Sequence, residues 1–426
     1  MNTTKDLFKS FREVSHNATF AGVALMVAFL LALAWSNISI NSYTAFWNQP
    51  FSIGFNGHVL EKPLLIWIND GLMAFFFFVV GLEIKREVLF GELNSIQKSI
   101  TPAVAALGGM LVPALIYILL NKDGANINGW GIPMATDIAF SLGVISLLGN
   151  HIPKSAKIFI VALAIVDDLG AVLVIALFYS SDISIINLCL GLSFFVTMLI
   201  SNFIGIRNTV YYGLLGIGGV WFTFLLSGVH PTIAGIIAAF TIPANRTISV
   251  SSFNHHLLGF YSKIRRKSSK AFNQKLINTI RDSFEGVEPP LQKLEYRFAP
   301  WVNYLVLPLF ALANAGFVIS DSFHQSIFSS VGLGTFSGLL FGKPLGILLS
   351  LWIFKKLNLI EFPAGLTNRH LIGVSILAGI GFTMSLFISN LAFSDPQTLT
   401  QAKAGVFLAS MLAGILGYLV LRKKMV

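Results

Sequence analysis

The sequence contains little charge and a single cysteine. Of its 426 residues only 11% are Asp, Glu, Lys or Arg, whereas soluble globular domains carry about 25%. Cys189 has no second cysteine with which to form an intrachain disulfide, and a metal centre built from several thiolates is excluded. A soluble enzyme, a secreted disulfide-stabilised domain and a disordered chain do not fit this composition.

Apolar residues take the place of the missing charge. They make up 55% of the chain, and the mean hydropathy is +0.75. A window of about 19 residues finds twelve apolar runs, and such runs form helices because lipid offers open backbone groups no hydrogen-bond partner. The sequence therefore predicts an all-α polytopic membrane protein that forms one domain over residues 1–426. The twelve expected transmembrane helices lie near 18–37, 63–84, 99–120, 129–149, 156–180, 184–204, 209–228, 231–244, 298–319, 331–354, 371–393 and 402–421.

Lysine and arginine are distributed unevenly between the segments that connect these runs. If the N-terminus is cytoplasmic, 25 of the 29 basic residues fall in cytoplasmic segments, and only Lys62, Lys122 and Lys403 fall outside. This bias follows the positive-inside rule and predicts that both termini are cytoplasmic. It also explains the net charge of +10 without a nucleic-acid partner.

Two connecting segments have features of their own. Residues 49–62, on the outside, alternate apolar and polar side chains from Phe51 and then reach Asn56-Gly57, a pair typical of a two-residue turn. They predict a β-hairpin, with an irregular loop as the alternative. The long cytoplasmic loop 245–297 is strongly basic and is expected to contact anionic lipid headgroups, with a regulatory partner site as the alternative.

Four charged residues fall inside predicted transmembrane helices: Asp137, Asp167, Asp168 and Lys343. Each costs about 2.5–3.5 kcal/mol at the bilayer centre, which argues for function over structure. Asp167 and Asp168 are adjacent, so on a helix their side chains point about 100° apart. We expect Asp167 to pair with Lys343, the one cation inside a predicted helix, and Asp168 to face an ion. A structural ion pair is the alternative for each of the four.

The fourth and eleventh helices both contain signals for an interruption. Pro133 removes a backbone donor shortly before Asp137, and Gly379 and Gly381 lie two residues apart in the eleventh helix. Paired interrupted helices in the two halves of a sequence mark the substrate site of many secondary transporters. Because such breaks expose helix ends with partial charges, we expect Asp137 to offset the N-terminal ends and Lys343 the C-terminal ends.

The ligands at this predicted site are hard oxygen donors. Asp168, Asp137 and the Thr136 hydroxyl suit Na⁺ or Li⁺ better than a transition metal, and no cofactor is expected. A desolvated carboxylate holds either a proton or a metal cation near neutral pH, but not both. Competition of this kind is itself a mechanism for exchanging one for the other.

Four further residues are candidates of lesser weight. Asp70, inside the second helix, is either structural or part of an entry path. Glu83 and Arg86, at the inside end of that helix, form either a solvated helix end or a sensor. His230 lies in an outside turn, where it either titrates near neutral pH or is a hydrogen-bonded turn residue.

Several motifs resemble those of the NhaA family of bacterial sodium–proton antiporters, in order from about residue 15 to 422. This resemblance implies inverted-topology repeats, with interrupted fourth and eleventh helices that cross. The motifs are Trp-Ile-Asn-Asp70, Val-Gly-Leu-Glu83-Ile-Lys-Arg86-Glu, Ala-Thr136-Asp137-Ile-Ala-Phe, Ala-Leu-Ala-Ile-Val-Asp167-Asp168-Leu-Gly-Ala, Ser-Gly-Val-His230, Phe-Ala-Leu-Ala-Asn314-Ala-Gly, Gly-Lys343-Pro-Leu-Gly and Gly379-Ile-Gly381-Phe-Thr-Met-Ser.

The resemblance also implies an activity. Asp168 and Asp137 would bind the cation with Thr136 nearby, and Asp167, paired with Lys343, would take part in proton exchange. The family exchanges two protons for one Na⁺ or Li⁺ at alkaline pH, and it serves sodium extrusion, salt tolerance and pH homeostasis. It resides in the bacterial inner membrane as a homodimer joined through the outside hairpin.

Two departures from the family pattern concern pH and length. Family members commonly carry histidines just after the glutamate that aligns with Glu295, where this sequence has Tyr296 and Ala299. Glu83, Arg86 and Glu295 remain, so the resemblance implies a pH-sensing cluster without these histidines. The loop 245–297 is also longer than the family's usual connection.

Three other classes of function compete with an antiporter. An intramembrane aspartyl protease needs Gly-x-Gly-Asp at its second aspartate, which Asp137 and Asp168 both lack. A passive cation channel has little use for a buried aspartate–lysine pair. A related transporter of another substrate, such as a sodium-coupled organic anion, is the remaining alternative, and the adjacent aspartates favour proton-coupled exchange over it.

Overall fold

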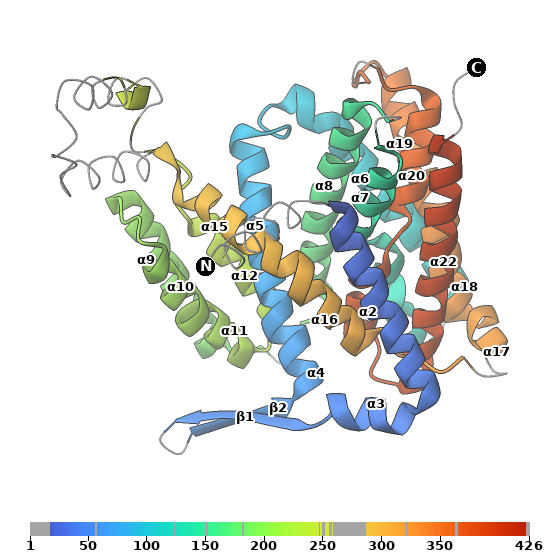
Figure 1. The fold of residues 1–426 in the computed structure, drawn as a ribbon, viewed down its shortest axis with the longest axis horizontal. Coiled ribbons are helices and arrows are strands. Elements are labelled where there is room, and N and C mark those ends of the chain that lie inside the picture. The colour runs from blue at the N-terminus through green and yellow to red at the C-terminus, as the bar shows by residue number, and fades with distance from the viewer. Residues whose placement is uncertain are drawn as a thin grey trace, which may run out of the picture.

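Helices occupy the apolar runs of the sequence (Figure 1). Within the described residues, eight helices are long and apolar enough to cross a membrane, or ten if each of two bent helix pairs is one span. The prediction of a largely helical membrane protein is therefore confirmed. The computed structural model describes residues 18–422 apart from 56–57, 123, 150–151, 181–182, 247, 249–251, 255–257, 259–286, 320–322 and 363–364.

The long helices include three that contain a wider, π-helical turn. Each such turn continues the helix on both sides rather than ending it. The long helices are α2 (Ala18–Ile38), α4–η1–α5 (Leu64–Ile66, Trp67–Leu72, Met73–Phe90), α6 (Ile96–Leu120), α8 (Lys154–Phe178), α9 (Ile185–Ile204), α10–η4–α11 (Thr209–Leu214, Leu215–Trp221, Phe222–Ser227), α18–η6–α19 (Ser330–Ser337, Gly338–Gly342, Lys343–Lys356) and α22 (Pro396–Arg422).

Several helix boundaries differ from the prediction, among them the starts of the ninth and twelfth helices. The ninth run was expected at 298–319, but helix α15 starts at Pro290 and continues through η5 and α16 to Asn314. Its first turns are polar, so a hydropathy window misses them. Helix α22 starts at Pro396, so Lys403 lies in a helix and not in an outside loop. The shorter helices are α3 (Ile40–Trp47), α12 (Pro231–Thr241), α15 (Pro290–Trp301), η5 (Val302–Val306), α16 (Leu307–Asn314) and α17 (Phe323–Phe328).

Two pairs of helices meet at short breaks. Helix η2 (Gly124–Met134) bends by 43° into α7 (Ile138–Leu147), and α20 (Asn368–Ala378) bends by 40° into α21 (Phe382–Ala392). The first break follows Pro133, and the second contains Gly379 and Gly381. The glycines are needed there, because an added Cβ at Gly379 would come within 2.5 Å of the Leu339 carbonyl oxygen.

A single two-stranded antiparallel sheet is present among the described residues. Strands β1 (Pro50–Phe55) and β2 (His58–Pro63) pair with Ile53 opposite Leu60, which confirms the two predicted strands. The indole of Trp67 donates to the Phe51 carbonyl oxygen at 2.9 Å and so attaches the sheet to helix α4–η1–α5. The Asn56-Gly57 turn lies outside the described residues.

The basic loop predicted at 245–297 is described only at its two ends. Helix α15 takes up its last part, from Pro290, and the backbone of Leu291 donates to the Pro243 carbonyl oxygen. Most of the loop's lysines and arginines, including Lys263 and Arg265, lie outside the described residues. The expected contact with lipid headgroups therefore stays a prediction.

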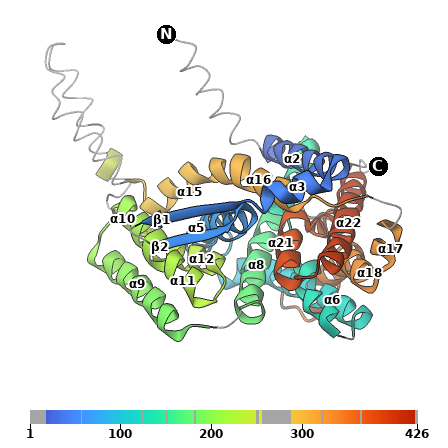
Figure 2. The same ribbon diagram turned by 90° about the horizontal axis from the view of Figure 1, so that it is seen from below.

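Two groups of helices face each other across the molecule (Figures 1 and 2). In the first helix group (α5, α9–α12, α15, α16), α5 packs against α12 and α15. In the second helix group (α6–α8, α18–α22), α6 packs against α8, α18 and α19, and α22 packs against α18, α20 and α21. Helix α2 contacts both α16 and α7 and so borders both groups.

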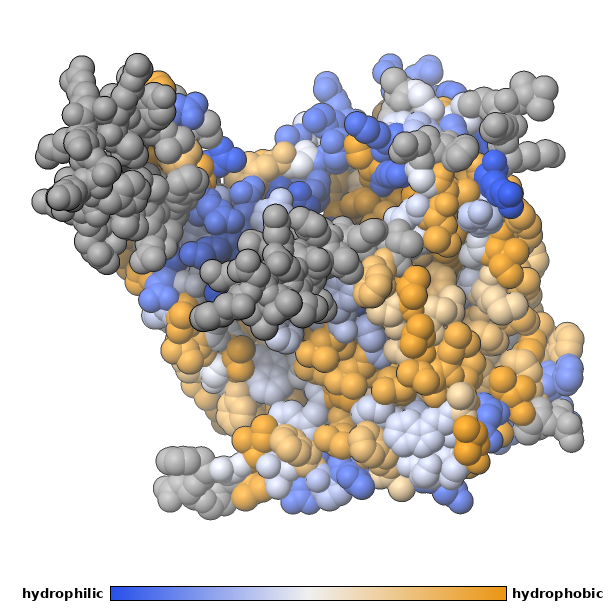
Figure 3. All heavy atoms as spheres, viewed as in Figure 1, coloured by the Kyte–Doolittle hydropathy of each residue, from blue (hydrophilic) through white to orange (hydrophobic). Residues whose placement is uncertain are grey.

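The surface has a belt of apolar residues between two hydrophilic ends (Figure 3). The sheet lies at one end, here called the hairpin side, and the start of α15 lies toward the opposite side (Figure 1). Exposed leucines and phenylalanines such as Leu115, Phe203 and Leu345 are suited to lipid contact. This arrangement is that of a multi-pass membrane protein.

Candidate ion-binding site

A buried lysine and a buried aspartate form an ion pair in the middle of the second helix group. Lys343 Nζ lies 2.5 Å from Asp167 Oδ2, and the two residues are 0% and 1% exposed. The same ammonium donates to the main-chain carbonyl of Met134, at the C-terminal end of η2. Lys343 thus offsets the partial negative charge of that helix end as well as the charge of Asp167.

The neighbouring aspartate points elsewhere. Asp168 lines a cavity of about 200 Å³ that lies between the two helix groups, whereas Asp167 does not line it. The carboxylate of Asp168 makes no hydrogen bond or ion pair with any other described residue. Adjacent positions on α8 therefore carry one carboxylate that is paired through its Oδ2 and one that faces the cavity, as the turn of about 100° per residue predicts.

Asp137 holds the two helix breaks together. It caps α7 by accepting from the amide of Phe140 at 2.9 Å through Oδ1. Its Oδ2 accepts from the amide of Thr383 at 3.0 Å and from the Thr383 hydroxyl at 2.6 Å, at the start of α21. One carboxylate thus offsets the positive ends of two helices, which is the arrangement expected from the sequence.

The Thr136 hydroxyl connects the ion pair to the second break. It lies 2.6 Å from Asp167 Oδ2 and 3.0 Å from the Ala378 carbonyl oxygen, at the end of α20. Because a hydroxyl has one proton, it can donate to only one of these acceptors at a time. Thr136 also lines the cavity, so its oxygen is within reach of an ion beside Asp168.

Two further hydroxyls were missed by sequence reasoning. Ser141, in α7, donates to the Leu377 carbonyl oxygen of α20 at 3.0 Å, and Ser385, in α21, donates to the Ile132 carbonyl oxygen of η2 at 2.7 Å. Each serine is the fourth residue of its helix, α7 or α21. The two bonds are therefore reciprocal, and each interrupted helix is tied to the other.

A second group of charged residues also lines this cavity. Glu83 of α5 and Glu295 of α15 both border it, together with Ala299. Arg86 Nε lies 3.0 Å from Glu295 Oε1, and an Arg86 terminal nitrogen lies 2.9 Å from Glu87 Oε1. The structure thus connects the predicted Glu83, Arg86 and Glu295 cluster to the cavity that Asp168 enters.

Asp70 and His230 lie away from the cavity, toward the hairpin side. Asp70 is 13 residues, or roughly 20 Å of helix, from Glu83. Lys62 Nζ lies 3.6 Å from one Asp70 oxygen, and His230 Nε2 lies 3.8 Å from the other. His230 Nδ1 is 2.7 Å from the Thr232 hydroxyl, and burial lowers the pKa of His230 to about 4. His230 is hydrogen-bonded at the start of α12, as a turn histidine would be.

These contacts define what the site can hold. Asp168, Asp137 and Thr136 all line the same small cavity. Within the described part of the chain, no cluster of three or more His, Cys, Asp and Glu side chains is arranged to hold a metal ion.

Interrupted helices whose ends meet at buried carboxylates are the architecture of a secondary transporter. Residues 12–421 match the family described as Na⁺/H⁺ antiporter 1. The chain belongs to this family, and it is a transporter rather than an enzyme.

Individual relatives are similar over their whole length. The chain is 44% identical to the Na(+)/H(+) antiporter NhaA of Oleidesulfovibrio alaskensis, over 98% of this chain and 94% of the relative. It is 45% identical to the antiporter of the same name from Acidithiobacillus ferrooxidans, over 97% of each. With the antiporter NhaA of Helicobacter pylori it shares 41% identity, over 98% of this chain and 96% of the relative.

Proposed function

We propose that this protein is a secondary antiporter that exports Na⁺ or Li⁺ in exchange for protons. The observation that carries the proposal is the free carboxylate of Asp168 in a cavity, next to the buried Asp167–Lys343 pair. A desolvated carboxylate can hold a cation or a proton but not both, so binding of one releases the other. The family match supports Na⁺ as the cation.

The site contains two groups that can exchange protons. Asp168 is one, and the Asp167–Lys343 pair is the other, because its ammonium can release a proton and later take one up again. Two protons moved against one Na⁺ transfer one net charge, so the exchange is electrogenic. Thr136 supplies an oxygen to the bound cation, and Asp137 holds the helix ends in place.

The proposed topology has twelve transmembrane helices. The eight long helices and the two bent pairs give ten spans. The eleventh is the short helix α12, and the twelfth is α15–η5–α16, which begins with polar turns. The reciprocal bonds of Ser141 and Ser385 support two structural repeats of opposite orientation. Both termini face the cytoplasm of a bacterial inner membrane, and the hairpin, on the outer face, joins two copies.

The cluster of Glu83, Arg86 and Glu295 is the proposed sensor of alkaline pH. Glu83 and Glu295 line the cavity that Asp168 enters, where ionised carboxylates would attract a cation. The chain lacks histidine at 296 and 299, so the carboxylates and Arg86 carry this response. The physiological roles would be sodium extrusion, salt tolerance and pH homeostasis.

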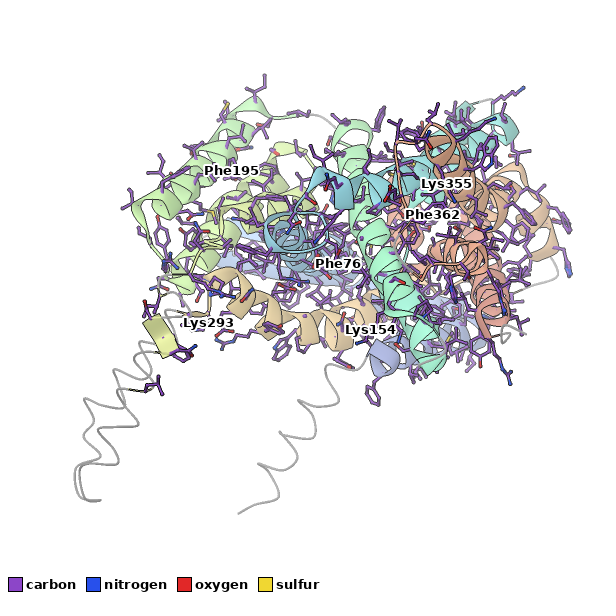
Figure 4. All side chains as sticks on the ribbon, turned by 90° about the horizontal axis from the view of Figure 1, so that it is seen from above. Phe76, Lys154, Phe195, Lys293, Lys355 and Phe362 are labelled. Atoms are coloured by element: carbon purple, nitrogen blue, oxygen red, sulfur yellow. The ribbon has the colours of Figure 1, made fainter. Side chains whose placement is uncertain are left out.

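Anionic lipids are proposed to contact the basic residues opposite the hairpin side. Lys355 lies 4.4 Å from the ring centre of Phe362, and Lys356 lies 5.2 Å from that of Trp352. Figure 4 labels Lys355 and Phe362 beside each other. Such aromatic–lysine pairs are typical of the boundary between apolar core and headgroups.

Everted membrane vesicles from cells without their own antiporters test the exchange. A fluorescent probe would follow the proton gradient as NaCl or LiCl is added at several pH values. We expect the probe signal to recover with the wild type, more strongly at alkaline pH, and not with Asp168→Asn. Asp395→Asn, which changes an exposed aspartate just before α22, is the matched control and should behave as the wild type. Equal recovery with Asp168→Asn would contradict the role of Asp168.

A further inference from the structure

Three asparagines from three helices form one hydrogen-bonded cluster. Asn314, at the end of α16, and Asn69, in η1, bond reciprocally, with Asn69 Nδ2 3.2 Å from Asn314 Oδ1 and Asn314 Nδ2 2.8 Å from Asn69 Oδ1. Asn390 of α21 donates to the same Asn314 oxygen at 2.9 Å. Asn314 belongs to the first helix group, and Asn69 lies in η1, which leads directly into α5 of that group. Asn390 belongs to the second helix group. The bond between Asn390 and Asn314 therefore crosses between the groups.

The cluster lies beside a series of cavity-lining residues and buried phenylalanines on these helices. On α16 and α21 the cavity-lining residue is followed by a buried phenylalanine and then by the asparagine, and on α5 the cavity-lining Phe76 and the buried Phe77 are adjacent and follow Asn69. Ring centres of Phe77 and Phe310 lie 5.8 Å and 6.1 Å from that of Phe387, and all three rings are almost fully buried. The cavity residues of the series are Phe76, Leu307 and Met384 (Figure 4 labels Phe76).

The three phenylalanines and the three asparagines close the cavity toward the hairpin side. The cavity extends from Asp168 to Glu83 and Glu295, and none of the three phenylalanines or three asparagines lines it. An antiporter must expose its ion site to each side in turn, so the closed side has to open during the cycle. This step rests on the function proposed above.

We propose that the Asn390–Asn314 hydrogen bond is the latch that holds the hairpin side of the ion site closed. The cluster is suited to open and close repeatedly. When Asn390 leaves, Asn314 keeps both of its bonds to Asn69, so no buried amide of that pair is left unpaired. Asn390 keeps its second bond, to the Leu386 carbonyl oxygen at 2.9 Å. Within the cluster, opening thus breaks one neutral hydrogen bond, and it also separates Phe387 from Phe77 and Phe310, whose rings exclude water when the latch is shut.

Accessibility of a cysteine in the cavity tests this latch. In a Cys189→Ser background, Met384→Cys places a thiol in the cavity wall, and a membrane-impermeant thiol reagent is applied to vesicles of either orientation. A separate Val59→Cys variant, on the exposed strand β2, identifies which orientation exposes the hairpin side. We expect Asn390→Leu to raise labelling of the cavity thiol from the hairpin side by about fivefold, the effect of one lost hydrogen bond, without raising it from the opposite side.

Asn202→Leu is the matched control. Asn202 is also half-buried, and its amide donates to the Thr241 carbonyl oxygen at 2.8 Å, but this bond joins α9 and α12 within one helix group. It should change labelling from neither side. Unchanged labelling from the hairpin side in Asn390→Leu, or an equal rise from both sides, would overturn the latch.

A second variant and a second measurement separate a failure of the latch from a failure to fold and from a failure of the proposed function. If Asn390→Leu does not reach the membrane, Asn390→Ser is measured instead, because its side chain is too short to reach Asn314, and the same result is expected. Sodium–proton exchange of the Cys189→Ser parent is recorded beside the labelling. Absence of exchange in the parent counts against the function alone, whereas exchange with unchanged hairpin-side labelling in the variant counts against the latch alone.

Discussion

Asp137 and Thr383 meet across 246 residues of sequence, and the threonine donates to one carboxylate oxygen with both its amide and its hydroxyl. Because Asp137 also caps α7, this contact fixes the start of α21 against the start of α7. The ion site is thereby built on two helix ends that cannot be displaced separately without breaking a charge-assisted hydrogen bond.

Replacement of Thr383 tests this contact. Thr383→Val removes the hydroxyl and keeps the shape and the amide, so we expect a loss of about 1.5–3 kcal/mol in the free energy of unfolding and slower exchange. Thr383→Ser restores the donor and should recover both. Thermal unfolding in detergent and vesicle exchange provide the measurements. A Thr383→Val protein as stable as wild type would show that the amide alone holds Asp137.

Lys343→Ala should strongly destabilise the protein. It leaves Asp167 buried without its partner, and breaking a buried pair in this way costs about 3–5 kcal/mol. The double variant Asp167→Asn with Lys343→Met removes both charges, so it should regain most of the melting temperature. It should not regain exchange, because the second proton-exchanging group is gone. Full exchange by the double variant would exclude the pair from proton transfer.

Sodium affinity should depend on pH with a definite slope. If one proton competes with Na⁺ at Asp168, the apparent Kd for Na⁺ rises tenfold for each pH unit lost where the carboxylate is protonated, and a hundredfold if two protons compete. Na⁺-dependent thermal stabilisation of purified protein, measured from pH 6 to pH 9, gives this slope. A Kd that stays constant over that range would contradict direct competition.

His230 should make the protein less stable as pH falls. Burial and the nearby Lys62 lower the pKa of His230 to about 4, whereas an unfolded histidine titrates near about 6.5. Between these values the unfolded chain binds a proton that the native His230 does not, so stability decreases toward acid, by up to about 1.4 kcal/mol per pH unit. His230→Gln should flatten this part of the curve. Asp70, 3.8 Å away, is the group that would oppose the trend if it stayed ionised.

Arg86→Gln should shift the pH profile of exchange to higher pH. Arg86 pairs with Glu295 and Glu87. A neutral side chain at position 86 would no longer favour the ionised form of these carboxylates. Arg86→Lys, which keeps the charge, should shift the profile less. Vesicle exchange at intervals of half a pH unit would show the shift, and an unchanged profile in both variants would remove this cluster from pH sensing.

Much of the fold and part of the site follow from the sequence. The lengths of the apolar runs locate the helices. Because Asp167 and Asp168 are adjacent on one helix, their side chains must point in different directions. Asp167, Lys343 and Asp137 are readable because a charge in an apolar run is rare and costly. The strands of the hairpin are readable from alternation alone.

Other parts depend on contacts that sequence reasoning does not reach. Ser141, Ser385 and Thr383 are three of many hydroxyl residues in apolar helices, and only the crossing of the two breaks selects them. The asparagine cluster joins residues at 69, 314 and 390, whose spacing carries no local signal. The start of α15 is polar apart from one face with Leu291 and Leu294, and this face is buried as α15 packs against α5.

The hydrogen bonds at the two breaks also bear on how a cation is hydrated. The carbonyl oxygens of Ile132, Met134, Leu377, Ala378 and Ile380 all accept from Ser385, Lys343, Ser141, Thr136 or the Asp137 amide. Few backbone oxygens are therefore left to replace the water around an arriving ion. A cation beside Asp168 would keep part of its own water shell, and the cost of removing the rest would set which alkali ions the protein accepts.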